Sequence, residues 1–157
     1  MTAKRIQLEL CTASAEDCLV AEQGGANRLE LNSALLLGGL TPSIGTLREA
    51  RRSVRIPIVV MIRPRPAGFC YSRTEFNVMQ RDLEAALAEG ADGIAFGILD
   101  AGGRIDLERS RLMVKLAPGR QVVFHRAFDV VPEPLPALDQ LAELGVTRVM
   151  TSGQEAS

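Results

Sequence analysis

Six short apolar runs alternate along the chain with segments that have helix-start and helix-stop signals, and this alternation constrains the fold more than any other feature. The runs begin at residues 6, 27, 57, 93, 121 and 147, a mean spacing of about 28 residues. Each run has either the period-two alternation or the β-branched composition of a strand. Strands separated by helices form a parallel sheet with right-handed crossovers. The pattern therefore predicts an α/β fold.

Two parallel architectures agree with this alternation, a doubly wound open sheet and a (β/α)8 TIM barrel. No Gly-x-Gly-x-x-Gly sequence follows the first strand and no Walker A loop is present, which removes the usual nucleotide-binding signatures. Eight units of this spacing would need roughly 226 residues, close to the size of a TIM barrel. We therefore predict one domain over residues 1–157, a TIM-barrel type that is incomplete, with about six parallel strands and five helices.

An incomplete barrel would leave the edges of its first and sixth strands unpaired. The inward-facing Val59 and Val123 would then be partly exposed. We therefore expect the chain to aggregate or to assemble through these edges, for example as a homo-oligomer.

Capping residues predict where the helices begin. Ser14 and Ser72 each precede an acidic residue by three positions, the spacing of a capping box. Thr41-Pro42 is expected to cap the second helix with proline at its first position, and Asp106 to cap the fourth.

Composition excludes several classes of function. Eighteen basic and nineteen acidic residues are interspersed and give a net charge of −1, whereas a nucleic-acid-binding protein normally has a basic face. No apolar run is long enough for a membrane span or a signal peptide. Three cysteines at unrelated spacings do not form a disulfide framework. We expect a cytoplasmic protein with reduced thiols.

The segment 122–129 carries the only histidine of the chain. It begins as a buried strand and then presents His125, Arg126 and Asp129 within five residues. Parallel α/β proteins place their chemistry at this end of a strand. The alternative is a hydrogen-bonded core histidine next to a structural clamp between Arg126 and Asp129.

Other predicted strands end in a similar way. If Leu8, Leu10, Leu29 and Leu31 pack on the helices, the alternate residues point into the barrel. The inward residues near one rim are then Glu9, Cys11, Glu30, Asn32, Arg63 and His125.

Buried charges persist only when they are paired, so we expect Glu9 and Glu30 to bond to Arg63 or Arg126. Such a cluster is either a structural ring of ion pairs or a ligand site. The position at the carboxyl end of the strands favours a ligand site.

The three cysteines have different expected environments. Cys11 ends a strand and points inward, which makes it a candidate soft-metal ligand or nucleophile. Cys18 lies within a helix and is expected in the core, whereas Cys70 lies in a loop. No Cys-x-x-Cys or His-x-x-x-His spacing occurs, so the sequence alone gives only a weak metal signal.

Several stretches, taken together and in order, resemble the CutC copper homeostasis family over nearly the whole chain. They include Gly38-Gly39-Leu40-Thr41-Pro42-Ser43, Phe124-His125-Arg126-Ala127-Phe128-Asp129 and residues 9–11, 28–31, 62–65, 69–72 and 144–154. The resemblance implies a cytosolic TIM barrel that is associated with copper tolerance and proposed to bind Cu(I). Family members continue for roughly two further βα units. Many have a second cysteine where this chain has Asn32.

Two functions follow as hypotheses. The first is a copper homeostasis protein that binds Cu(I) through Cys11. The second is an enzyme acting on a small anionic metabolite, with Glu9 or Glu30 as general base and His125 as acid/base. The residues expected to bind this ligand are Asn32, Arg63, Arg65, Arg126 and Asp129. A third interpretation is an inactive remnant of a longer protein.

Overall fold

The sheet contains six parallel strands arranged in chain order. The computed structural model describes residues 6–155. Neighbouring strands pair in the order β1-β2-β3-β4-β5-β6. They are β1 (Glu9–Thr12), β2 (Arg28–Leu31), β3 (Ile58–Met61), β4 (Gly93–Phe96), β5 (Gln121–Phe124) and β6 (Arg148–Val149). A doubly wound sheet reverses its strand order at a switch point, and this sheet does not.

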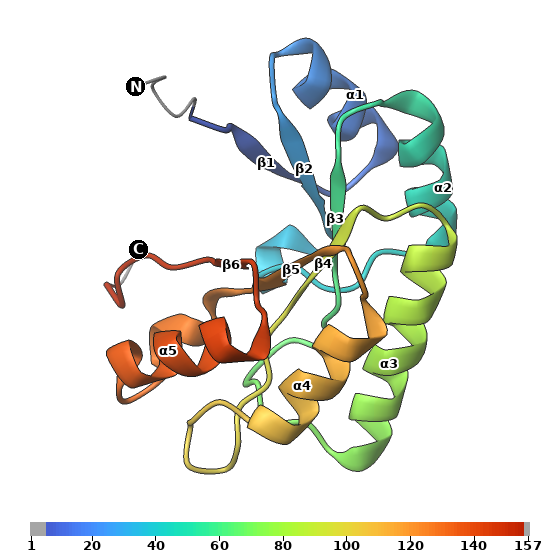
Figure 1. Cartoon of the computed structure of the whole chain (residues 1–157). Coiled ribbons are helices and arrows are strands. Elements are labelled where there is room, and N and C mark those ends of the chain that lie inside the picture. The colour runs from blue at the N-terminus through green and yellow to red at the C-terminus, as the bar shows by residue number, and fades with distance from the viewer. Residues whose placement is uncertain (1–5, 156–157) are drawn as a thin grey trace.

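Five α-helices lie along the outer, convex side of the strongly curved sheet (Figure 1). They are α1 (Ala15–Gln23), α2 (Ile44–Ser53), α3 (Arg73–Ala88), α4 (Leu107–Leu116) and α5 (Pro134–Leu144), with two short 3₁₀ segments, η1 (Leu35–Leu37) and η2 (Arg126–Val130). Helices on one face of a sheet in chain order are the arrangement of a TIM barrel. The predicted fold, a partial (β/α) barrel with six strands and five helices, is confirmed as a half-barrel.

The capping residues fix most helix starts as expected. Ser14, Asp106 and Ser72 each accept a backbone hydrogen bond in the first turn of α1, α4 and α3. The prediction for Thr41-Pro42 is wrong, because the N-cap of α2 is Ser43, whose hydroxyl accepts from the Thr46 N–H. Thr41 instead accepts from the Arg63 N–H at 2.9 Å, which ties it to the end of β3.

The main hydrophobic core fills the space between the sheet and the helices. Leu29 and Leu31 are fully buried there, as their parity predicts. Leu8 and Leu10 share that parity but remain 49% and 38% exposed. Their exposure has a topological cause, because β1 is an edge strand of the described sheet.

A second, smaller apolar cluster lies on the concave side of the sheet. It contains Val59, Met61, Ala95 and Val123, with Met150 packed against it. Val59 and Val123 have no exposed surface, so the prediction that they would be partly exposed is wrong. The sheet curls enough for inward side chains to pack on one another, and β1 and β6 make contact through Glu9 and Arg148.

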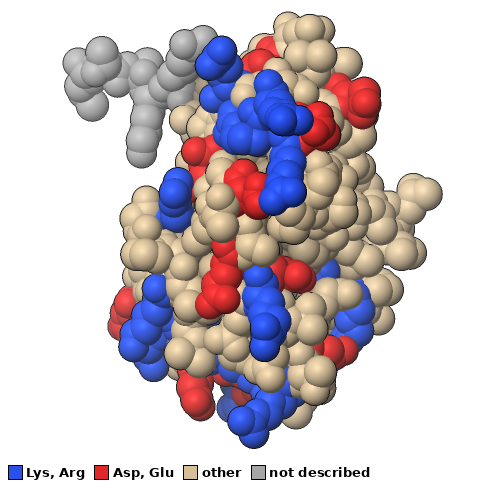
Figure 2. Space-filling model, turned by 90° about the vertical axis from the view of Figure 1, so that its right-hand side faces the viewer, with Lys and Arg blue, Asp and Glu red and all other residues tan. Residues whose placement is uncertain are grey.

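The outer face carries charges of both signs. Figure 2 shows basic and acidic side chains interspersed on the face that it presents, without a large area of one sign. Pairs such as Arg48 with Glu89 and Arg52 with Glu49 neutralise one another locally. Within residues 6–155, no helix has the length and apolar character needed to cross a membrane.

Candidate functional site

A cavity of about 160 Å³ opens at the carboxyl ends of the strands, and we call it the mouth pocket. It brings together six of the predicted site residues, which come from β1, from β2 and from the segments directly after β2, β3 and β5. They are Cys11, Glu30, Asn32, Arg63, His125 and Arg126, and the remaining lining residues are Leu35, Gly38, Met61, Phe69 and Met150. Glu9, Arg65 and Asp129 do not line it.

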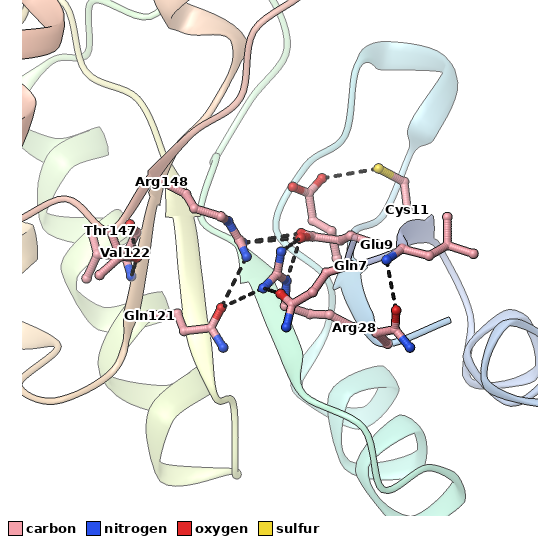
Figure 3. Close-up of polar contacts among 11 residues, drawn as sticks. Gln7, Glu9, Cys11, Arg28, Gln121, Val122, Thr147 and Arg148 are labelled. Atoms are coloured by element: carbon pink, nitrogen blue, oxygen red, sulfur yellow. Dashed lines mark hydrogen bonds and ion pairs between the residues drawn. The ribbon is translucent and has the colours of Figure 1, made fainter. Parts of the chain in front are cut away.

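Glu9 lies at the opposite, amino end of the strands. Its carboxylate pairs with Arg28 on the neighbouring strand and with Arg148 on β6, at 3.3 Å. Gln121 accepts hydrogen bonds from both arginines (Figure 3). The expectation that Glu9 pairs with Arg63 or Arg126 is therefore wrong, because Glu9 lies two residues before the pocket-lining Cys11 on the same strand.

Glu30 is buried and forms no ion pair with Arg63 or Arg126 among the described residues, contrary to expectation. Its Oε1 accepts from the Asn32 amide at 3.1 Å and from the Cys11 thiol at 3.5 Å, while Oε2 has no hydrogen-bond partner. Burial raises the pKa of this carboxyl above its usual value. A carboxyl with a raised pKa and a free oxygen is suited to proton transfer.

The thiol of Cys11 lies against that carboxylate (Figure 3). Although part of the residue is exposed, desolvation of the sulfur and the negative charge of Glu30 raise the pKa of the thiol to about 12. Because the thiolate is the reactive form, this environment makes Cys11 a weak nucleophile. As expected from the sequence, Cys18 is buried and Cys70 is exposed.

His125 follows β5 and caps η2. Its Nδ1 accepts from the Ala127 N–H at 3.1 Å, and its Nε2 has no partner. Burial, with the positive charge of Arg63, lowers the pKa of His125 to about 3. The imidazole is therefore neutral near pH 7.

Arg63 extends from β3 toward the loop that contains η1. Its Nη1 donates to the carbonyls of Leu37, Gly38 and Gly39 at 3.1–3.2 Å, while Nε has no partner. The φ of Gly39 is +82°, and a side chain there would collide with the Asn32 amide. The glycine loop therefore lets the Arg63 guanidinium and the Asn32 amide approach the same pocket wall.

Two residues that position the His125 ring were not identified from the sequence. The Phe69 ring lies 5.2 Å from both the His125 ring and the Arg63 guanidinium carbon. Gly97 has no side chain, and a Cβ at this position would lie only 2.5 Å from His125 Nδ1. A glycine next to a strand is a known signal of close approach, and Gly97 allows the imidazole to lie across the end of β4.

Arg126 and Asp129 form the structural clamp that was the alternative interpretation. Arg126 donates to Asp129 at 2.8 Å, and Asp129 also accepts from Thr151 and Ser152. Burial opposes ionisation, but these hydrogen bonds outweigh it and hold the pKa of Asp129 well below its usual range. The clamp joins η2 to the segment after β6.

Arg65 lies in the connection before α3. It pairs with Glu75 and donates to the carbonyl of Cys70 at 2.9 Å. Residues 6–155 contain no group of three or more His, Cys, Asp or Glu side chains that could hold a metal ion.

The CutC family model matches residues 6–157, which is nearly the whole chain and includes every residue of the mouth pocket. The chain belongs to the CutC family. A CutC family protein of Treponema denticola is 51% identical over 152 residues, and these cover 97% of this chain and 62% of that protein. The mouse protein named copper homeostasis protein cutC homolog is 49% identical and is 55% covered.

A solved structure of the CutC family has the same fold. The crystal structure of CutC from Streptococcus agalactiae superposes with a TM-score of 0.91 at 34% identity, covering 96% of this chain and 74% of that one. By comparison, this chain spans 62% of the length of the Treponema denticola protein and 55% of the length of the mouse protein.

Proposed function

We propose that the protein takes part in copper homeostasis, the role in the name of the mouse relative, and that it does so in the cytoplasm. We further propose that the mouth pocket is its functional site. One observation carries the assignment of the site. Among the described residues, six buried polar side-chain atoms lack a hydrogen-bond partner, and four of them belong to residues that line this pocket. They are Glu30 Oε2, Asn32 Oδ1, Arg63 Nε and His125 Nε2.

Buried polar atoms without partners cost about 1–3 kcal/mol each. A ligand that pairs them recovers that free energy, so the pocket is built for a small polar molecule. Arg63 makes an anion the preferred ligand, since charge-assisted hydrogen bonds are the strong ones. Glu30 is the candidate general base of an enzyme acting on this ligand, because its carboxyl has a raised pKa and a free oxygen.

Arg63→Met and Arg65→Met form a matched pair for testing this site. Both remove a guanidinium from the same connection, but only Arg63 lines the pocket. Melting temperatures are measured with and without a panel of small carboxylates and phosphate. We expect Arg63→Met to abolish the ligand-induced shift and Arg65→Met to retain it. If Arg63→Met lowers the melting temperature by the same amount with and without every ligand, the role of Arg63 is purely structural.

Direct Cu(I) binding is the second candidate. The thiol of Cys11 and the thioethers of Met61 and Met150 line the same pocket, and Cu(I) prefers soft sulfur ligands. Binding must displace a thiol proton whose pKa is raised to about 12, which opposes it near pH 7.

Competition against a colorimetric Cu(I) chelator tests this second function. Wild type and Cys70→Ser should each bind one equivalent of Cu(I) per chain, because Cys70 lies outside the pocket. Cys11→Ser should lose this equivalent to the chelator. An unchanged Cu(I) affinity in Cys11→Ser would exclude this site. The anion function predicts the opposite, namely ligand-induced shifts that do not depend on the Cys11 thiol.

A further inference from the structure

Two backbone contacts fix which groups in the mouth pocket donate and which accept. The Ala127 N–H points at His125 Nδ1 at 3.1 Å, so Nδ1 carries the lone pair. A neutral imidazole has its proton on one nitrogen only, and that proton is therefore on Nε2. The free nitrogen of His125 is a hydrogen-bond donor.

The Asn32 amide is oriented in the same way. Its Nδ2 donates to the backbone carbonyl of Glu30 at 3.1 Å, and a carbonyl oxygen can only accept. The free atom of Asn32 is therefore the acceptor Oδ1. The free Glu30 Oε2 is also an acceptor when the carboxyl is ionised, since the Cys11 thiol and the Asn32 amide both donate to Oε1.

The pocket-lining residues thus contribute two chemically distinct pairs of unpartnered atoms, which we call the donor wall and the acceptor wall. Arg63 Nε and His125 Nε2, after β3 and β5, donate. Glu30 Oε2 and Asn32 Oδ1, at the end of β2, accept. A ligand with acceptors alone, such as sulfate or the dianion of a phosphate monoester, pairs the donor wall, but it leaves the Glu30 carboxylate unpaired and is repelled by it.

We propose, resting on the small-molecule site proposed above, that the ligand is a small carboxylate with a hydroxyl or ammonium group on the adjacent carbon. Its carboxylate accepts from Arg63 and His125, and its hydroxyl or ammonium donates to Glu30 and Asn32. The cavity of about 160 Å³ suits a molecule of this size. His125 acts here as a neutral donor that orients the ligand, since its Nδ1 is committed to the Ala127 N–H.

Calorimetric titration with lactate, alanine and propionate tests the ligand class. All three probes are three-carbon carboxylates. They differ only on the carbon next to the carboxylate, which carries a hydroxyl in lactate, an ammonium in alanine and only hydrogen in propionate. We expect lactate or alanine to bind about tenfold or more tightly than propionate, because propionate leaves the acceptor wall unpaired. The comparison of lactate with alanine then separates the hydroxyl from the ammonium form. Equal affinity for all three would overturn this inference while retaining the anion site, and no binding of any probe at millimolar concentration would overturn both.

Glu30→Met checks that the preference arises at the acceptor wall. It replaces the carboxyl with an apolar group of similar length and removes the negative charge that repels propionate. The propionate affinity should therefore rise, while the advantage of lactate or alanine should shrink, because only Asn32 Oδ1 remains as an acceptor. An advantage that persists in full in this variant would contradict the assignment.

The tautomer has an independent readout because His125 is the only histidine of the chain. A long-range ¹⁵N–¹H spectrum at neutral pH should show one neutral imidazole protonated at Nε2, and the best-binding probe should shift that Nε2 signal. A proton on Nδ1 would overturn the proposed role of His125 whether or not the probes bind.

Discussion

Arg148 on β6 lies with its guanidinium Nη2 3.3 Å from the Glu9 carboxylate on β1, so the first and last strands of the sheet are joined by an ion pair. Arg28 binds the same carboxylate, and Gln121 accepts from both arginines. Two partly buried guanidiniums therefore depend on one carboxylate. This arrangement links the two edge strands of the half-barrel through side chains at the amino ends of the strands.

Glu9→Gln should destabilise the fold. It removes the charge that separates Arg28 from Arg148, and unpaired, partly buried charges of like sign are costly. We expect the free energy of unfolding to fall by about 2 kcal/mol, measured by urea denaturation. Glu49→Gln is the control, because its pair with Arg52 is exposed and should contribute within about 0.5 kcal/mol. Equal effects of the two substitutions would contradict the prediction.

Gly97→Ala should disrupt the mouth pocket. A Cβ at Gly97 would lie 2.5 Å from His125 Nδ1 and 2.7 Å from the Ala127 Cβ, so the imidazole must move. We expect a loss of about 1–3 kcal/mol in stability, with loss of ligand-induced melting shifts. Gly45→Ala is the matched control, since its nearest neighbouring atom would be 3.7 Å away and alanine favours a helix. Unchanged ligand binding in Gly97→Ala would show that the position of His125 does not matter.

The buried neutral His125 should make the protein less stable as the pH falls. Its pKa is about 3 in the folded state, whereas an unfolded histidine has a pKa near 6.5. At a pH between these two pKa values, only the unfolded chain binds a proton at His125. The stability should decrease by up to about 1.4 kcal/mol for each pH unit below 6.5.

His125→Asn isolates this contribution, since asparagine can still accept from the Ala127 N–H and leaves Glu30 unchanged. Urea denaturation of both proteins between pH 7 and pH 5 gives the difference. Parallel stability curves for wild type and variant would mean that His125 titrates normally.

Cys11 should react slowly with iodoacetamide. A thiol with a pKa of about 12 is almost entirely protonated at pH 8, so mass spectrometry should show Cys70 modified well before Cys11. Glu30→Gln removes the adjacent negative charge and should speed the modification of Cys11. A faster reaction at Cys11 than at Cys70 in the wild type would refute this environment.

Asn32→Cys should strengthen Cu(I) binding if copper occupies the mouth pocket. It places a second thiol beside Cys11 on the adjacent strand, and two thiols suit soft Cu(I). The chelator competition should show an increase in affinity of about tenfold or more. Ser33→Cys, one residue farther along, provides a second thiol outside the pocket lining. No gain from Asn32→Cys would place any copper site elsewhere.

Local patterns in the sequence determined the elements and much of the pocket. The period of two along 28–32 assigned Leu29 and Leu31 to the helices and Glu30 and Asn32 to the interior, because parity depends only on the strand itself. The inward position of His125 follows from the same rule. The sequence could also predict the chain-ordered barrel from its regular βα spacing.

Tertiary structure alone decided the partners of the charged groups. Glu9 pairs with Arg28 and Arg148 rather than with Arg63, since the pairing depends on strand register and on the curvature that brings β6 back to β1. Arg65 turns away to Glu75 although it lies two residues after Arg63. The Ala127 N–H determines which nitrogen of His125 carries the proton, and the space above Gly97 determines where the ring lies. Such contacts depend on angstrom-scale positions in three dimensions, and residue spacing along the chain does not encode them.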